Sequence, residues 1–262
     1  MVAGSGPTWL TLGPPITCPG RLPVVDHHLE VTTTAGWVTR SADVFELAIR
    51  ATIDSLGRCV MAISGGNTPA AVFGELARRD LPWDKVVIVQ VDERLAAIGS
   101  NQRNLTQQLQ AFGDLPLRWL ALPVAEPIDD GIATFTEALI AVAGDPPVLD
   151  VVHLGLGVDG HTASLVPGDP VLDVVDRDIA TTGVYRGHRR VTLCRPILDR
   201  ARLIVWLVHG APKASVLARL LDGDRSIPAG LLNPQQSVVV ADDAAVPTRP
   251  VGGAGQNRPS GH

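Results

Sequence analysis

The sequence predicts an α/β fold: a mainly parallel open sheet with helices on both faces, doubly wound and Rossmann-like. Two observations predict it. Apolar runs of β type alternate along the chain with helical stretches, the pattern of strands joined by crossover helices. Several runs, such as VVIVQV and LIVWLV, are apolar at nearly every position, as expected of strands that are covered on both faces.

The expected elements cover most of the chain, whose 262 residues suit one α/β domain or two small ones. We expect a single domain over 24–246, between a Gly- and Pro-rich flexible arm at 1–23 and a flexible tail at 247–262. The expected strands are Cys59–Ser64, Lys85–Val91, Trp119–Leu122, Leu149–Gly155, Arg190–Cys194, Leu203–Val208 and Gln236–Val240. The expected helices are Ser41–Leu56, Pro69–Arg79, Asn101–Phe112, Asp130–Ala143 and Ala211–Leu221.

The composition limits the classes of binding partner that we expect. The formal net charge of -5 provides no basic footprint for a nucleic acid, although a local cluster of cations and backbone N–H groups can still bind an anion. Three widely spaced cysteines favour neither a disulfide framework nor a metal knuckle. No signal pattern is present, and no apolar segment approaches the roughly 20 residues of a membrane span. We therefore expect a cytoplasmic protein without nucleic-acid or membrane partners; monomer and homodimer both remain open.

The first candidate binding segment is Ser64-Gly65-Gly66-Asn67-Thr68-Pro69, directly after an apolar run. In parallel sheets, ligands bind beyond the carboxyl ends of the strands. Thr68 suits a helix N-cap and Pro69 the first helical position. Two glycines and the N–H groups of a new helix favour an anion such as phosphate. An ordinary glycine turn before a capped helix is an equally good interpretation of this segment alone.

Charged side chains follow other expected strands. Asp92-Glu93-Arg94 comes after VVIVQV; it is in part a solvated strand end, but Asp92 could hold a sugar hydroxyl and Arg94 an anionic group. Arg190 begins RVTLC, and Lys213 lies near a helix N-terminus. That location suits a lysine poorly because of the helix dipole, so an anion is a sensible partner for Lys213. A plain surface lysine remains an equal alternative.

The segment Gly155–Ser164, GLGVDGHTAS, places Asp159 and His161 two residues apart after another buried run. A histidine can act as a general base on water, and a nearby carboxylate can fix its tautomer and raise its basicity. Alternatively the two side chains merely cap a following helix, with Thr162 and Ser164 as further caps. The segment alone slightly favours capping, whereas its position near the glycine loop favours catalysis.

Other histidines give weaker signals. His153 lies in an apolar strand, where a histidine is more often a satisfied core residue than a ligand, and His188 and His209 have no partner that the sequence identifies. The pair His27-His28 has no Cys, Asp or Glu at ligand spacing, so we expect no metal site.

Taken together, the motifs resemble a known family. SGGNTP, VDER followed by Ser100-Asn101, LGLGVDGHTASLVPG, RRVTL and LVHGAPKASVL are similar in order and spacing to the motifs of 6-phosphogluconolactonases. The resemblance covers roughly residues 24–245, and its most specific element is GxDGHTASLxPG. Glucosamine-6-phosphate deaminases share the glycine loop and the Asp-Gly-His, but they usually continue as His-Ile-Ala-Phe-Asn, and they tend to have Asp-Glu-Tyr where this chain has Asp-Glu-Arg.

The resemblance implies an enzyme that hydrolyses 6-phospho-D-glucono-1,5-lactone to 6-phosphogluconate in the oxidative pentose phosphate pathway, without metal or coenzyme, and that 24–246 is its catalytic domain. It implies that His161 is the general base, oriented by Asp159, and that Arg94 holds substrate or stabilises the anion formed at the attacked carbonyl. The remaining implied residues form the substrate and phosphate site: Ser64, Gly65, Gly66, Asn67, Thr68, Asp92, Arg190 and Lys213.

Two other functions remain as alternatives. One is an aldose–ketose isomerase that deaminates an amino-sugar phosphate, which Thr162-Ala163-Ser164 disfavours. The other is a catalytically silent sugar-phosphate sensor, as in the effector domains of some transcription regulators. The catalytic groups that the resemblance implies, and the absence of a helix-turn-helix pattern ahead of residue 40, disfavour the sensor.

Overall fold

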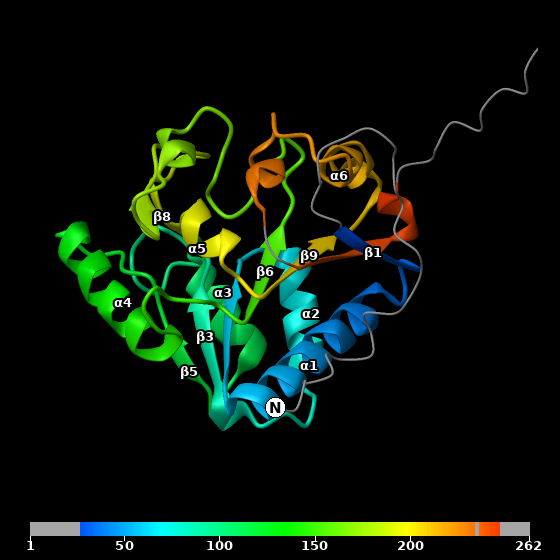
Figure 1. The fold of residues 1–262 in the computed structure, drawn as a ribbon, viewed down its shortest axis with the longest axis horizontal. Helices are drawn as coiled ribbons and strands as arrows, with labels where there is room; N and C mark the ends of the chain where they lie inside the picture. Colours follow the sequence, from blue (N-terminus) through cyan, green and yellow to red (C-terminus); the bar gives the residue numbers. More distant parts are fainter. Residues whose placement is uncertain (1–26, 234–235, 247–262) are drawn as a thin grey trace, which may run out of the picture.

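A seven-stranded parallel sheet forms the centre of the molecule. The computed structural model describes residues 27–233 and 236–246, so the predicted arm at 1–23 and tail at 247–262 lie outside the described residues. The strand order is β1-β10-β9-β6-β2-β3-β5, with every neighbouring pair parallel (Figure 1). The strands are β1 (His27–Thr32), β2 (Cys59–Ile63), β3 (Val86–Gln90), β5 (Arg118–Leu120), β6 (Val151–Gly155), β9 (Leu203–Val208) and β10 (Ser237–Asp242).

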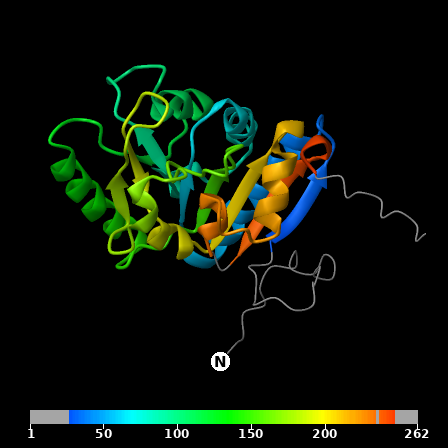
Figure 2. The same ribbon diagram turned by 90° about the horizontal axis from the view of Figure 1, so that it is seen from above.

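Helices cover both faces of this sheet. Helices α1 (Trp37–Leu56), α2 (Asn67–Ala77) and α3 (Asn104–Phe112) contribute to one hydrophobic core. Helices α4 (Ile128–Ala143), α5 (Arg195–Asp199) and α6 (Ala214–Leu221) contribute to the other. Seen from above, the molecule extends from β1 at one end to α4 at the other (Figure 2). The predicted fold class is confirmed.

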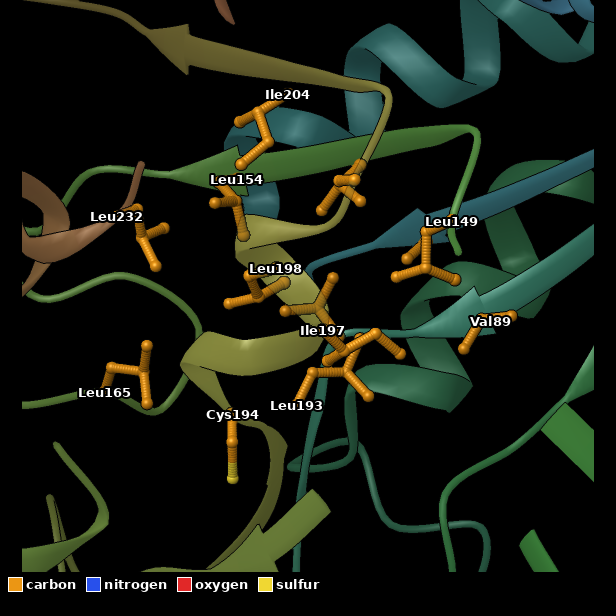
Figure 3. Packing of buried hydrophobic residues seen from close by; sticks show 14 of the residues in the cluster. Val89, Leu149, Leu154, Leu165, Leu193, Cys194, Ile197, Leu198, Ile204 and Leu232 are labelled. Carbon is orange, nitrogen blue, oxygen red and sulfur yellow. The ribbon is translucent and has the colours of Figure 1, made fainter. Parts of the chain in front are cut away.

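The alternation of side chains along each strand explains the two cores. In β2, Val60 and Ala62 lie in the core under α4, whereas Cys59, Met61 and Ile63 lie in the core under α1. Strands β2, β3, β9 and β10 are buried at every position, as their continuous apolar runs predict. Figure 3 shows the core under α4, α5 and α6, in which Leu154 and Ile204 of the sheet lie near Leu198 of α5.

A second, smaller sheet lies beside the carboxyl edge of the first. Strands β4 (Asp92–Arg94), β8 (Arg190–Leu193) and β7 (Ile179–Thr181) pair antiparallel in the order β4-β8-β7. Val91 connects the two sheets: its N–H donates to Ile63 of β2 and its carbonyl accepts from Leu193 of β8. The run that begins at Arg190 is therefore a strand, as predicted, but outside the parallel sheet.

One local expectation is wrong, and one of the alternatives for the Gly155–Ser164 segment is excluded. Helix α2 begins at Asn67 after Gly66, whose φ is 122°, so Thr68 is not the N-cap, and Pro69 is the third helical residue rather than the first. Proline is still tolerated there because N–H groups of the first turn have no partner within the helix. Residues 156–169 form turns rather than a helix, so Asp159 and His161 do not act as helix caps.

Some helix bounds differ from those expected, and short 3₁₀ helices connect several of the elements. Helix α6 follows a 3₁₀ turn within the segment predicted as one helix, and α3 begins at Asn104 rather than Asn101. None of the helices in the described ranges has the length and apolarity to cross a membrane. The 3₁₀ helices are η2 (Trp83–Lys85), η3 (Pro170–Asp173), η4 (Ala211–Lys213), η5 (Pro228–Leu231) and η6 (Asp243–Ala245).

Candidate active site

A cavity of about 700 Å³ opens where the carboxyl ends of β2, β6 and β9 meet the small sheet. The cavity is lined by the glycine loop after β2, the turn after β6, Lys213 after β9, and Arg94 and Arg190 from the small sheet. Every site residue predicted from the sequence lines this cavity except Asp159, which contacts the ring of His161. The structure thus brings together segments that are far apart in the chain.

Asp159 and His161 form a close pair. His161 Nδ1 lies 2.5 Å from Asp159 Oδ1, and the backbone N–H of His161 donates to the same oxygen at 3.2 Å. Partial burial would raise the pKa of Asp159, but the hydrogen bonds from His161 and Tyr185 outweigh it and lower the pKa to about 2. The ionised carboxylate therefore holds the Nδ1 proton, which leaves Nε2 free to accept another.

The turn that carries this pair has no room for a larger residue. The N–H of Gly157 donates to the carbonyl of His161 at 2.8 Å. A Cβ atom at Gly157 would lie 2.0 Å from His161 Nδ1 and 2.6 Å from Asp159 Oδ1. Gly160 has a φ of 83°, a conformation that favours glycine. The backbone of this turn therefore constrains the spacing of the pair.

The glycine loop approaches α3 closely. A Cβ atom at Gly65 would lie 2.3 Å from Asn104 Oδ1, and the N–H of Gly66 donates to Gln107 Oε1 at 3.3 Å. Asn67 and Thr68 are exposed in the first turn of α2 and line the cavity. Backbone N–H groups at such a helix start attract anions, and a phosphate cradle in this loop stays a prediction.

Ser64 is tied to His153 rather than free. Its N–H donates to His153 Nδ1 and its hydroxyl donates to the His153 carbonyl, both at 3.2 Å. His153 is fully buried and packs edge-on against Phe45 and Phe73. Burial lowers its pKa to about 3, so the ring is neutral. It is a core histidine, as the sequence favours, but Nε2 has no hydrogen-bond partner among the described residues, so the ring is not fully satisfied.

Asp92 and Arg190 face each other in a buried pair. Arg190 Nη1 lies 3.5 Å from Asp92 Oδ2, and the exposed fractions of the two side chains are only 8% and 5%. Asp92 also accepts from the Ser164 hydroxyl at 2.6 Å and from Asn104 Nδ2 at 3.1 Å. Burial raises the pKa of Asp92, although Ser164 and Arg190 oppose the shift. Burial lowers the pKa of Arg190, and Asp92 opposes that shift.

The other two residues of the Asp-Glu-Arg motif, Glu93 and Arg94, have different surroundings. Glu93 is fully buried, and its carboxylate accepts from the N–H groups of Asn104 and Leu105 at 2.8 and 2.9 Å, at the start of α3. Arg94 lines the cavity, and its Nη1 donates to the Gln102 carbonyl at 2.8 Å. Glu93 therefore secures a helix end, while the residues on either side of it face the cavity.

Lys213 reaches the turn that holds the pair. Its Nζ donates to the Leu156 carbonyl at 2.5 Å. Burial lowers the pKa of Lys213, and the nearby charge of Asp159 opposes the shift. The sequence suggests an anion as its partner; the partner in the structure is a backbone carbonyl, and the side chain also lines the cavity.

Sequence reasoning missed several side chains of the site. Tyr185 donates its hydroxyl to Asp159 Oδ2 at 3.0 Å; its one available signal is that it is the chain's single tyrosine. The sequence gives no sign that the Ser164 hydroxyl donates to Asp92. Arg186 and His188 line the cavity beside Tyr185, and His209 lines it with its Nε2 at 3.5 Å from Asp242.

The described residues hold no group of three or more His, Cys, Asp or Glu side chains that could bind a metal ion. The parallel sheet and the cationic cavity at its carboxyl edge define an α/β enzyme. A family model described as glucosamine-6-phosphate isomerases/6-phosphogluconolactonase matches residues 32–241. The chain belongs to this family, as the resemblance of its motifs predicts.

Relatives within the family agree with this assignment. The 6-phosphogluconolactonase of Synechocystis sp. is 36% identical over 198 residues, which are 70% of this chain and 81% of the relative. The solved 6-phosphogluconolactonase of Thermotoga maritima has a TM-score of 0.75 at 20% identity, over 83% of this chain and all of that one. A solved monomeric glucosamine-6-phosphate deaminase has a TM-score of 0.71 at 16% identity, over 83% of this chain and 98% of the other. The fold alone therefore does not separate the two activities.

Proposed function

We propose that this chain hydrolyses 6-phospho-D-glucono-1,5-lactone to 6-phosphogluconate, and that residues 24–246 form its catalytic domain. The observation that carries the proposal is the Asp159–His161 pair at the wall of a cavity that also holds Arg94, Arg190 and Lys213. The relatives named 6-phosphogluconolactonase and the Thr162-Ala163-Ser164 segment support the lactonase over the deaminase.

In this mechanism His161 acts first as a general base. Nε2 takes a proton from a water molecule as the water oxygen attacks the lactone carbonyl carbon, and the carbonyl oxygen gains the negative charge. Asp159 stabilises the imidazolium that forms. The tetrahedral intermediate then collapses, the bond to the ring oxygen breaks, and the same proton passes from His161 to that oxygen. Only water is consumed, and the carboxylic acid that forms releases its proton to the solvent to give 6-phosphogluconate, so the atoms and charges balance without another reactant.

The cations divide between the two ends of the substrate. The glycine loop, with the start of α2, suits the phosphate, because helix N-termini favour anions. In this proposal Arg94, whose Nη1 donates to the Gln102 carbonyl, stabilises the oxyanion. Arg190 and Lys213 complete the positive wall against the substrate phosphate. A lactone is activated toward attack and its leaving group stays tethered, so one base and one anion site suffice.

The test is a coupled assay on freshly made lactone, corrected for uncatalysed hydrolysis. We expect His161→Ala to lower turnover at least about a hundredfold, the scale of a lost general base. His28→Ala, on the edge strand β1 outside the cavity, is the matched control and should retain turnover. Unchanged turnover in His161→Ala would overturn the proposal. Ammonia release from glucosamine 6-phosphate would support the deaminase instead, and binding of 6-phosphogluconate without hydrolysis would support the sensor.

A further inference from the structure

The connection between β7 and β8 is a tight hairpin that places a tyrosine against the acid–base pair. The backbones of Tyr185 and His188 bond to each other in both directions, at 2.9 and 3.3 Å. Arg186 and Gly187 between them have φ values of 50° and 83°, the two consecutive positive angles of a type I′ turn. The turn fixes where the Tyr185 ring lies relative to β8.

The hydroxyl of Tyr185 donates to the carboxylate oxygen of Asp159 that does not contact His161. His161 Nδ1 lies 2.5 Å from Oδ1, whereas the tyrosine hydroxyl donates to Oδ2 at 3.0 Å. The hydroxyl also lies 3.4 Å from His161 Nδ1, and the two rings meet edge to face with centroids 5.4 Å apart. Asp159 is partly exposed, so without this contact its carboxylate could turn and exchange its two oxygens.

The face of the same ring supports two cations. The guanidinium carbons of Arg186 and Arg190 lie 5.1 and 5.4 Å from the centroid of Tyr185, within the range of a cation–π interaction. Arg190 also forms an ion pair with Asp92. One side chain thus touches the acid–base pair with its hydroxyl and the cations with its ring.

We propose that Tyr185 is a positioning residue for the hydrolysis: its hydroxyl locks Asp159 so that Oδ1 stays on His161 Nδ1 and Nε2 faces the bound lactone, while its ring holds Arg186 and Arg190 toward the substrate's anionic groups. This inference rests on the proposed function. Burial and the hydrogen bond to Asp159 raise the pKa of Tyr185, so the phenol remains protonated and keeps its role as donor at neutral pH.

The first test separates the hydroxyl from the ring. Tyr185→Phe removes only the oxygen, and we expect kcat to fall about tenfold, the scale of one hydrogen bond to a charged group, with KM within twofold of the wild type. Tyr185→Leu also removes the ring, so it should lower kcat similarly and in addition raise both KM and the Kd for 6-phosphogluconate measured by calorimetry. Thermal unfolding of each variant establishes that it is folded.

The second test asks whether the hydroxyl acts through the pair. In a double-mutant cycle, Tyr185→Phe should cause no further loss of rate when added to His161→Ala, because the group it positions is already absent. An equal tenfold loss in both backgrounds, or a Tyr185→Phe variant with wild-type kcat, would overturn the inference. A wild-type protein that does not hydrolyse the lactone above the uncatalysed rate would instead overturn the proposed function, so the two failures are distinguishable.

Discussion

The two sheets contribute to the cavity in different ways. The parallel sheet supplies the Asp159–His161 pair, the glycine loop and Lys213 from turns that follow its strands. The small antiparallel sheet supplies Arg94 and Arg190 from the strands themselves, and Tyr185 from the hairpin between two of them. The loops of the parallel sheet carry the groups that react with the lactone in the proposed mechanism, and the small sheet carries most of the positive charge.

The difference teaches how each half of the site is held in place. Asp159 and His161 are set by a glycine turn that leaves no space for a side chain at Gly157. Arg190 is set by contacts between side chains, namely those with Asp92 and Tyr185. A substitution in the glycine turn should therefore lower activity even though it alters no polar group. In the small sheet, the loss of one charge should lower stability, and removing the charge of its partner should restore much of it.

The largest effect is expected from Gly157→Ala. The added Cβ would lie 2.0 Å from His161 Nδ1, so the pair must separate or its turn must shift. We expect a loss of kcat near that of His161→Ala, about a hundredfold, measured in the coupled lactone assay. Gly155→Ala is the matched control, because a Cβ there meets nothing within 4 Å. Equal activities of the two alanine variants would contradict the idea that the backbone turn sets the spacing of the pair.

A smaller effect is expected from Arg190→Met in the small sheet. It removes a cation from the cavity and leaves Asp92 buried without its ion pair, so KM should rise by about ten- to a hundredfold and the free energy of unfolding should fall by roughly 3 kcal/mol. Adding Asp92→Asn should restore much of the stability but not the low KM. Denaturant unfolding and steady-state kinetics measure the two quantities. If the double variant is no more stable than Arg190→Met, the pair is not the source of the loss.

The sequence predicts the parallel sheet well and the small sheet poorly. The runs ending at Val208 and Val240 are long and apolar because both faces are covered, and such runs are recognisable without a structure. Strands β4 and β7 have three residues each, too short for any periodicity to be visible. The β7–β8 hairpin could be identified only from the turn residues Arg186 and Gly187, and Arg-Gly is not one of the strong hairpin signals.

The same contrast holds within the site. The glycine loop belongs to one short motif at a strand end, and Asp159 and His161 belong to another. Their placement at one edge of the sheet therefore follows from the fold class. The contacts of Ser164 with Asp92 and of Tyr185 with Asp159 join residues 72 and 26 positions apart. They depend on the exact register of the small sheet against the large one, which no local pattern in the chain encodes.

The smallest effect concerns His153, which joins β6 to the first residue of the glycine loop. Its pKa is lowered by burial to about 3 from an ordinary value of 6.5, so between those pH values the unfolded chain binds a proton that the folded protein does not. Stability must then decrease as the pH falls from 6.5 toward 3, by about 1.4 kcal/mol per pH unit from this group.

His153→Gln tests this contribution of His153 to the pH dependence of stability. The glutamine oxygen can still accept from the Ser64 N–H, but the side chain does not titrate. Denaturant unfolding at a series of pH values from 6.5 to 4.5 should therefore give a shallower decline for the variant, with the two stability curves converging at acid pH by about 1.4 kcal/mol per unit. Parallel curves would mean that the histidine is already able to take up a proton in the folded protein, and that the glycine loop is less rigidly held than its buried tie to β6 implies.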